Sequence, residues 1–274
     1  ASMPPLQFTR DELEALLLGA RMVQGWSDAA MAAKAEAAIT KIFATEALWR
    51  CADEALQTAG GNGYMREYPY ERVMRDARIN RIFEGTNDVL RLFVALTVLN
   101  DVGAKLKELA NSLKGIFEDP IKGFGVMYEY ARKRANWAAG LPVGNASFDK
   151  VHLALRPQAE AFEDLTRELA AMTDRILRKH GKNIIGKQFA TSRLADVMID
   201  LFTLACVLSR VTASIEAKGR EASEREIQIA QVFCGQVRAR ARDNFRRIDE
   251  NDDELIKALA EDAYEREGYG WDVL

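Results

Sequence analysis

The sequence predicts an all-α protein. Ala, Leu, Glu, Lys and Arg dominate the 274 residues, and these residues favour helices. Only 6 prolines and 18 glycines are present to interrupt them. Apolar residues recur every three or four positions over long stretches, and no stretch shows the alternation of a half-buried strand. We therefore expect helical bundles and no β-sheet.

Charge and cysteine content restrict the class of partner. The 38 basic and 41 acidic residues give a net charge of −3, which predicts no overall attraction to nucleic acid or to membranes. Cys51, Cys206 and Cys234 lack CxxC spacing and fall inside apolar helical patterns. We expect three buried, reduced thiols in an intracellular protein, without a signal peptide or a membrane-spanning run.

Two helices are predicted before residue 60. Thr9 and Glu12 form a capping box ahead of apolar residues at helical spacing, and Gly25 is a plausible stop. The second helix is expected over about residues 28–57. It ends at "GGNGY", where glycines give the backbone the freedom that a helix end requires.

Two more helices follow before residue 100. A proline in the first turn favours a short helix over about residues 69–78, with Val73 and Met74 turned inward. The next helix begins at Thr86 or Asn87, both of which suit a helix start.

The stretch at 105–125, "KLKELANSLKGIFEDPIKGFG", has an apolar face surrounded by lysines. Such a pattern is more often a helix on the surface of its own protein than a helix that contacts a membrane or a partner. Both interpretations are kept. Residues 140–147 are predicted to be a linker.

The C-terminal half predicts a second helical bundle. Three long helices are expected at about 152–180, 187–218 and 222–247, with Gly181 and Gly219 as stops between them. The middle helix is apolar on most sides and is expected at the buried centre. Its apolar stretch carries three charged residues: Asp196, Asp200 and Arg210. The acidic tail is expected to be a docked or frayed end.

Common catalytic and metal-binding motifs are absent from the sequence. His152 and His180 have no metal-ligand spacing, and there is no GxSxG elbow and no Walker loop. The "GGNG" run follows a predicted helix and not a strand, so it is not a dinucleotide-binding turn. The remaining candidate is the stretch 57–91, where glycines, arginines and one glutamate interrupt the helical periodicity.

Glu84 lies after Ile82 and Phe83 and before Gly85, just ahead of a helix start. A glutamate there is most often a solvated charge that the helix dipole favours. Burial against its apolar neighbours would instead make it a better proton acceptor toward a weakly acidic carbon. Gly85 would let a planar ligand approach the backbone.

Two stretches carry a family resemblance. "ALQTAGGNGYMREYPYERVMRDARINRIFEGTNDVLRLFVAL" resembles the C-terminal catalytic region of acyl-CoA dehydrogenases. "GKQFATSRLADVMIDLFTLACVLSR" resembles the additional C-terminal helical domain of the very-long-chain branch, and the similarity extends over about residues 37–274. The resemblance implies a flavoprotein oxidoreductase of fatty acid β-oxidation that converts long-chain acyl-CoA to trans-2-enoyl-CoA.

The resemblance also implies partners and a location. FAD would be the cofactor, electron-transfer flavoprotein the electron acceptor, and the enzyme a homodimer. It would lie in the bacterial cytoplasm or the mitochondrial matrix, with peripheral membrane contact through 105–125. No basic patch or DNA-reading helix is found, so a nucleic-acid partner is not expected.

The implied roles fall on individual residues. Glu84 would remove the α-proton of the acyl-CoA while the β-hydrogen leaves as hydride to the flavin. Its N–H would also help to bind the thioester carbonyl, and Gly85 would lie against the substrate. The implied cofactor positions are Gln57, Gly60, Gly61, Thr86, Asn87, Asp88 and Gln188.

Those cofactor positions form three groups. Thr86, Asn87 and Asp88 would meet the FAD phosphates and ribityl chain at a helix N-terminus. Residues 57–61 would receive the ADP half, commonly of the neighbouring subunit, and Gln188 would approach from the additional domain. Taken alone, the glycines are also consistent with a helix stop and Gln188 with a solvated amide. The arginines nearby favour structural ion pairs or phosphate steering: Arg75, Arg78 and Arg81.

The predicted organisation has four parts: an N-terminal helical segment at 1–42, part of the dehydrogenase bundle at 43–100, a linker with an amphipathic helix at 101–150 and the additional helical domain at 151–274. No stretch resembles the N-terminal helical domain or the β-domain of the family. Residues 3–42 resemble the linker segment of WYL-type transcriptional regulators, as in a fusion or chimera. The alternative to an enzyme region is therefore a non-catalytic helical scaffold without flavin.

Overall fold

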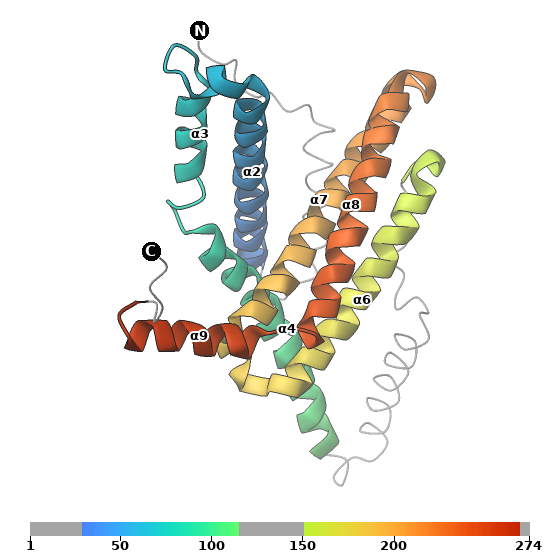
Figure 1. The fold of residues 1–274 in the computed structure, drawn as a ribbon. Coiled ribbons are helices and arrows are strands. Elements are labelled where there is room, and N and C mark those ends of the chain that lie inside the picture. The colour runs from blue at the N-terminus through green and yellow to red at the C-terminus, as the bar shows by residue number, and fades with distance from the viewer. Residues whose placement is uncertain (1–28, 115–150, 269–274) are drawn as a thin grey trace.

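The computed structural model describes residues 29–114 and 151–268, and every regular element in these two ranges is a helix (Figure 1). The predicted all-α class is confirmed for this part of the chain. The capping box at Thr9, the stop at Gly25 and the linker at 140–147 lie outside the described residues. No helix of the described ranges is long and apolar enough to span a membrane.

The first described helices form an antiparallel hairpin. Helix α2 (Ala29–Ala59) is followed by a 3-10 helix, η1 (Gly60–Tyr64), and then by α3 (Tyr70–Ile79), which returns alongside α2 (Figure 1). Gly63 makes the tight turn possible, because a Cβ at this position would lie 2.4 Å from the Leu56 carbonyl oxygen. No other residue fits there without a shift of the backbone.

Two expectations for this hairpin are wrong. Val73 was expected to turn inward with Met74, but its side chain is 43% exposed and Ala77 is the buried residue of α3. Consecutive helical residues point about 100° apart, so only one of the pair can face α2. Cys51 was expected to be buried, but it is exposed because its neighbour Ala52 takes the inward position.

Helix α4 (Asn87–Lys114) joins the hairpin to the second bundle (Figure 1). It packs against both α2 and α7. A small core forms where the three helices meet, with Val94 of α4 fully buried. Its other buried members come from α2 and α7: Ala35, Ala38, Ile39, Ile42, Ile199 and Phe202. The predicted amphipathic stretch at 105–125 begins inside α4, and its part beyond residue 114 lies outside the described residues.

The second bundle consists of α6 (Arg156–His180), α7 (Gln188–Lys218) and α8 (Glu224–Asp249) (Figure 1). The three predicted helices are confirmed to within four residues at their starts and two at their ends. Gly181 and Gly219 follow α6 and α7 with φ of 52° and 85°, a backbone region that favours glycine. Three short 3-10 helices complete this part: η3 (Leu153–Leu155), η4 (Gly181–Gly186) and η5 (Glu221–Ser223).

Helix α7 lies at the centre of this bundle, as its apolar sequence predicts. Its side chains are buried on several faces because α4, α6 and α8 all pack against it. Among them are large apolar side chains that are essentially inaccessible: Leu194, Val197, Leu201, Leu204 and Leu208. The two aspartates that interrupt this apolar pattern both meet arginines. Asp196 accepts a hydrogen bond from Arg91 Nε at 2.6 Å, and Asp200 accepts bonds from Arg240 at 2.6 and 3.0 Å.

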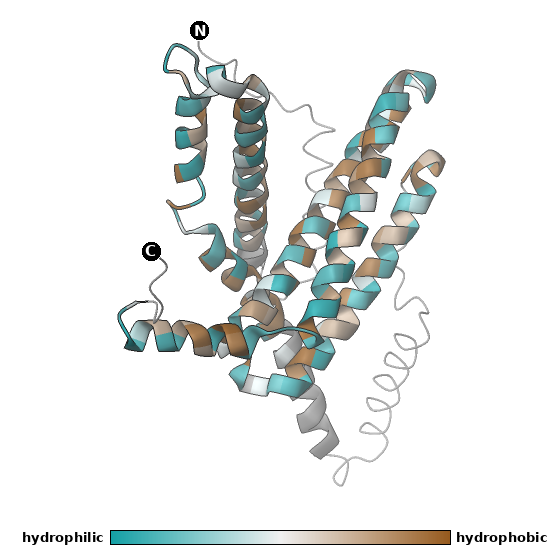
Figure 2. Cartoon of the chain, in the orientation of Figure 1, coloured by the Kyte–Doolittle hydropathy of each residue, from teal (hydrophilic) through white to brown (hydrophobic). Residues whose placement is uncertain are grey.

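The acidic tail forms a further helix, α9 (Asp253–Glu265), which projects away from the bundle (Figure 1). Its first residue docks on α7, because Arg193 donates two hydrogen bonds to Asp253 at 2.5 and 2.7 Å. Figure 2 shows hydrophobic residues along this helix. Several of them are exposed: Leu255, Ile256 and Leu259.

Candidate functional site

Glu84 lies in the short loop between α3 and α4, and its side chain is exposed. Its φ is 54°, and that of Gly85 is 89°, so two consecutive residues adopt left-handed backbone conformations. For a residue with a side chain this conformation costs about 1–2 kcal/mol. Such strain persists where the surrounding structure fixes the backbone, and it is often found at functional sites.

Lys41 of α2 holds this loop. Its Nζ donates to the Gly85 carbonyl oxygen at 2.9 Å and to Asn87 Oδ1 at 2.8 Å. The loop is also closed on itself, since the Asn87 N–H donates to the Arg81 carbonyl at 3.1 Å. The loop that contains Glu84 and Gly85 is therefore held by α2 and by the hydrogen bond that joins its two ends.

The side chain of Asn87 is turned into the contact between α4 and α2, where it is only 2% exposed. Its Nδ2 donates to Thr45 Oγ1 at 3.0 Å and to Glu46 Oε1 at 3.2 Å. Asn87 was a predicted cofactor position. Because its side chain faces α2, a ligand outside the loop would meet its backbone and not its amide group.

Thr86 begins α4. Its hydroxyl oxygen accepts a hydrogen bond from the Val89 N–H at 3.2 Å, and its carbonyl accepts one from the Leu90 N–H at 2.9 Å. The predicted start at Thr86 or Asn87 is thus confirmed, with Thr86 as the cap. The N-terminus of this 28-residue helix carries partial positive charge, which suits an anionic ligand.

A cluster of charged side chains lies behind the loop. Arg91 contacts Glu46 through both terminal nitrogens, at 2.9 and 3.0 Å, and Asp196 through Nε. Arg91 is largely buried, whereas each carboxylate keeps about a third of its surface exposed. The cluster joins α2, α4 and α7 beneath the site.

Burial and pairing shift the pKa values of this cluster in different directions. Burial alone raises the pKa of Glu46, but the hydrogen bonds and positive charge of Arg91 outweigh it, so the pKa lies below the usual value. Burial raises the pKa of Asp196, and Arg91 offsets this only in part. Burial disfavours the charge on Arg91, but its two carboxylate partners raise its pKa above the usual value.

The predicted cofactor residues do not form a single cluster within one chain. Gly60 and Gly61 lie at the far end of the hairpin, about 20 Å from Thr45 at 1.5 Å per helical residue. Gln57 is exposed in the last turns of α2. Gln188 begins α7, about 12 Å along that helix from Asp196. The structure brings together residues 84–88 and leaves the other positions apart from them.

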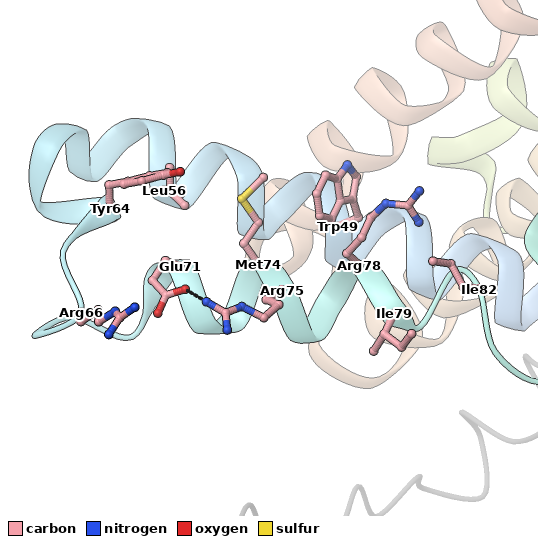
Figure 3. Close-up of a pocket in the computed structure, with 10 residues that line it drawn as sticks. All are labelled: Trp49, Leu56, Tyr64, Arg66, Glu71, Met74, Arg75, Arg78, Ile79 and Ile82. Atoms are coloured by element: carbon pink, nitrogen blue, oxygen red, sulfur yellow. Dashed lines mark hydrogen bonds and ion pairs between the residues drawn. The ribbon is translucent and has the colours of Figure 1, made fainter.

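An open groove of about 620 Å³ runs between α2 and α3 (Figure 3). Arg78 lies over the ring of Trp49 at 5.8 Å, and Arg75 pairs with Glu71 at 2.6 Å. The third predicted arginine, Arg81, lies 3.9 Å from Glu46. All three therefore contact side chains of the hairpin. The groove is lined by Trp49, Leu56, Tyr64, Arg66, Glu71, Met74, Arg75, Arg78, Ile79 and Ile82.

Sequence reasoning missed the residues of α2 that support the site. Lys41, Thr45 and Glu46 are spaced to lie near one another on a helix, beside the apolar positions that contact α7. A polar group at this spacing next to a buried stripe was the available signal. No group of histidine, cysteine or acidic side chains within residues 29–114 and 151–268 is arranged to hold a metal ion.

Two family models match the chain. One, described as the acyl-CoA dehydrogenase C-terminal domain, matches residues 9–99. It begins within the segment 3–42 and extends past the end of the Glu84 loop. The other, described as the ACAD9/ACADV C-terminal domain, matches residues 153–269 and so includes α6 to α9.

Whole-chain comparisons agree with these matches. The very long-chain specific acyl-CoA dehydrogenase of mitochondria from Bos taurus is 40% identical over 245 residues, which is 89% of this chain and 36% of the relative. The Rattus norvegicus protein of the same name is 38% identical over 251 residues, 92% of this chain and 37% of the relative. A probable acyl-CoA dehydrogenase, FadE10, from Mycobacterium tuberculosis is 28% identical over 249 residues. The chain thus spans little more than a third of the length of these relatives.

A solved structure has the same fold. The crystal structure of an acyl-CoA dehydrogenase complexed with FAD from Bacillus anthracis superposes with a TM-score of 0.64 and 23% identity. The match covers 91% of this chain and 43% of that one. The helical arrangement of Figure 1 therefore matches the fold of less than half of that longer protein.

Proposed function

The chain belongs to the acyl-CoA dehydrogenase family as a C-terminal region of the very-long-chain type, and we propose that it supplies the catalytic base for the oxidation of long-chain acyl-CoA. The product would be trans-2-enoyl-CoA, as in fatty acid β-oxidation. The observation that carries this proposal is the loop of Glu84, whose exposed carboxylate projects from a strained backbone beside a helix N-terminus.

In this proposal Glu84 accepts the α-proton of the bound thioester. An α-proton becomes acidic only when the developing negative charge on the thioester carbonyl is stabilised. The backbone N–H groups of Glu84 and Gly85 form no hydrogen bond within the described part of the chain, so they are free to donate to that oxygen. Gly85 has no side chain to keep the substrate away from them.

The residues around the loop fit one side of a flavin site. The N-terminus of α4 favours an anionic group, and its cap Thr86 and first residues Asn87 and Asp88 would meet the phosphates and ribityl chain of FAD. Bound FAD would supply the two-electron oxidant for the reaction, with electron-transfer flavoprotein as the next acceptor. Gln188 would approach the same cofactor from the additional helical domain.

A homodimer would explain the remaining cofactor positions. Gln57, Gly60 and Gly61 lie too far from Glu84 along α2 to contact the same small region of one flavin. If they receive the ADP half of FAD in a second subunit, the separation within one chain follows. By analogy with its relatives, the protein would be located in the mitochondrial matrix or the bacterial cytoplasm, with peripheral membrane contact through 105–125.

Flavin binding and substrate-dependent bleaching test the proposal. The chain is purified with added FAD and passed through gel filtration, and the flavin absorbance that remains with the protein is measured. A palmitoyl-CoA addition is then expected to bleach the bound flavin. Failure to retain FAD would favour the alternative, a non-catalytic helical scaffold, for this chain.

Two substitutions separate the role of Glu84 from general effects of charge. Glu84→Gln is expected to keep the flavin but to lose bleaching, because the amide cannot accept the α-proton. Glu67→Gln removes an exposed carboxylate from the loop before α3 and is expected to bleach as the unmodified protein does. Equal bleaching rates in both variants would eliminate Glu84 as the base.

A further inference from the structure

We propose that Lys41 is a positioning residue for the Glu84 loop. Its ammonium group holds the Gly85 carbonyl and thereby keeps Glu84 in the left-handed conformation from which the carboxylate projects. The significance for catalysis rests on the proposed function of Glu84. The mechanical part of the inference, that Lys41 fixes this backbone, stands on the contacts alone.

The contacts reach across the fold. Lys41 and Gly85 are 44 positions apart in the sequence, and the 2.9 Å bond between them joins the middle of α2 to the loop. Hydrogen bonds from a charged donor are stronger than those between neutral groups. Nζ directs a second such bond, of 2.8 Å, to Asn87 at the start of α4. One side chain therefore holds both sides of the turn.

The second partner of Lys41 is itself fixed. The Asn87 amide donates to Thr45 and Glu46, and the Thr45 hydroxyl donates to the Lys41 carbonyl at 2.8 Å. Thr45 lies one helical turn after Lys41, so these groups share a face of α2. This orients Asn87 Oδ1 toward the ammonium group and prevents the loop from moving as a unit.

The chemistry of Lys41 differs from that of a structural ion pair. Within the described ranges no carboxylate lies at ion-pair distance from its Nζ, although Glu46 is nearby on the same helix. Its two partners are neutral oxygens. The hydrophobic contacts and Arg91 already attach α2 to α4. A lysine whose charge is directed to a loop carbonyl therefore fixes the conformation of that loop.

Loss of Lys41 would release the strain at Glu84. The Gly85 carbonyl would lose its donor, and glycine adopts other backbone conformations readily. The peptide groups on either side of Glu84 would then reorient, and Glu84 would return to an ordinary conformation. Both its carboxylate and its N–H would leave the arrangement that proton transfer requires, and a misplacement of about 1 Å can cost on the order of 100-fold in rate.

Hydrogen–deuterium exchange of the purified chain tests the mechanical part without any cofactor. Lys41→Met is expected to speed exchange by at least about tenfold at the amides of Phe83 and Asn87, whose N–H groups donate to the Ile79 and Arg81 carbonyls and flank the loop. Lys41→Arg is expected in between because it keeps the charge. Lys34→Met, which removes an exposed lysine from the same helix, is the control and is expected to match the unmodified chain. Unchanged exchange in Lys41→Met, or in Lys41→Gln where the methionine variant does not fold, overturns the proposal.

Bleaching by acyl-CoA tests the catalytic part in the FAD-loaded protein. Lys41→Met is expected to retain flavin and to bleach about 10- to 100-fold more slowly, with partial recovery in Lys41→Arg. The pH dependence of the remaining rate should keep its shape, since the base is still Glu84. A rate equal to that of the unmodified protein would overturn the proposal. Failure of the proposed function would give a different result, namely unaltered bleaching in Glu84→Gln.

Discussion

Arg91 lies between two carboxylates from different helices, and its replacement by methionine tests how the site is attached to the second bundle. Methionine keeps much of the volume of the buried side chain but none of its hydrogen bonds. Glu46 of α2 and Asp196 of α7 would then face each other without the guanidinium between them. Both the pairing and the link between three helices are lost in one change.

The expected loss of stability follows from the exposure of the partners. Removing one member of a fully buried ion pair costs about 3–5 kcal/mol, because the other member is left as an unpaired charge. Here the two carboxylates are 33% and 37% exposed, so water can solvate them in part. We therefore expect Arg91→Met to lower the free energy of unfolding by about 2–3 kcal/mol at pH 7.

The loss should depend on pH in a definite direction. In the unmodified chain the pKa of Glu46 is lowered, so its contribution is present above its usual value and is lost as pH falls through the folded-state value. The pKa of Asp196 is raised, so its contribution is present at low pH and is lost as pH rises through the folded-state value. Without Arg91, burial dominates at both, and both pKa values are raised. The variant therefore recovers stability relative to the unmodified chain between pH 7 and pH 5.

Urea unfolding followed by circular dichroism at 222 nm measures this effect at both pH values. Arg75→Met is the matched control, because its pair with Glu71 is an exposed contact within one helix. That control should change stability by less than about 0.5 kcal/mol. A loss of stability in Arg91→Met no larger than that of the control, or one that is larger at pH 5 than at pH 7, would contradict the role of Arg91 between the two carboxylates.

Three further outcomes are expected. Gly63→Ala should lower the melting temperature by several degrees, because its Cβ would lie 2.4 Å from a backbone oxygen, whereas Gly61→Ala has open space; equal melting temperatures would contradict the turn geometry. Arg193→Ala removes the buried ion pair with Asp253, the first residue of α9, and should release that helix. Cleavage of α9 by trypsin and exchange of its amides should then be faster, and unaltered rates of both would show that other contacts hold it. Among the described cysteines, Cys51 should react first with iodoacetamide, because it is exposed while burial raises the pKa of Cys206 to about 11; faster labelling of Cys206 would contradict this.

Helix positions in the second bundle follow closely from the sequence. Gly181 and Gly219 have positive φ, so the residues that were predicted to end the helices are those whose conformation a side chain would oppose. The central place of α7 also follows from its pattern, because a helix that is apolar on most sides has to be surrounded. Local composition is sufficient here since both the stop signal and the burial signal lie within the helix itself.

The errors concern single faces of helices. Cys51 lies beside the buried Ala52 and Val73 beside the half-buried Met74, and the periodicity of a short apolar stretch does not distinguish two adjacent positions. Which of them faces inward depends on where the neighbouring helix lies. That information comes from the tertiary structure, and the same reason explains why no local pattern identified Lys41 as a partner of Gly85.

The local motif predicted a candidate site at the Glu84 loop but not the conformation of that loop. Gly85 was expected to allow a close approach, and it does adopt a positive φ. The left-handed conformation of Glu84 itself was not predicted, because few residues with side chains adopt it and no neighbour in sequence requires it. It depends on contacts between Lys41 and a loop more than 40 positions away.

The bond between Arg91 and Asp196 also sets an order of events during synthesis. The two residues are 105 positions apart, so at about 5–20 residues per second roughly 5–20 s pass between their emergence from the ribosome. During that interval Arg91 has Glu46 as its carboxylate partner, and the helix that follows the Glu84 loop has no α7 to rest on. The Glu84 loop is synthesised in full well before α7, and it acquires its final environment only when the last third of the chain has folded against it.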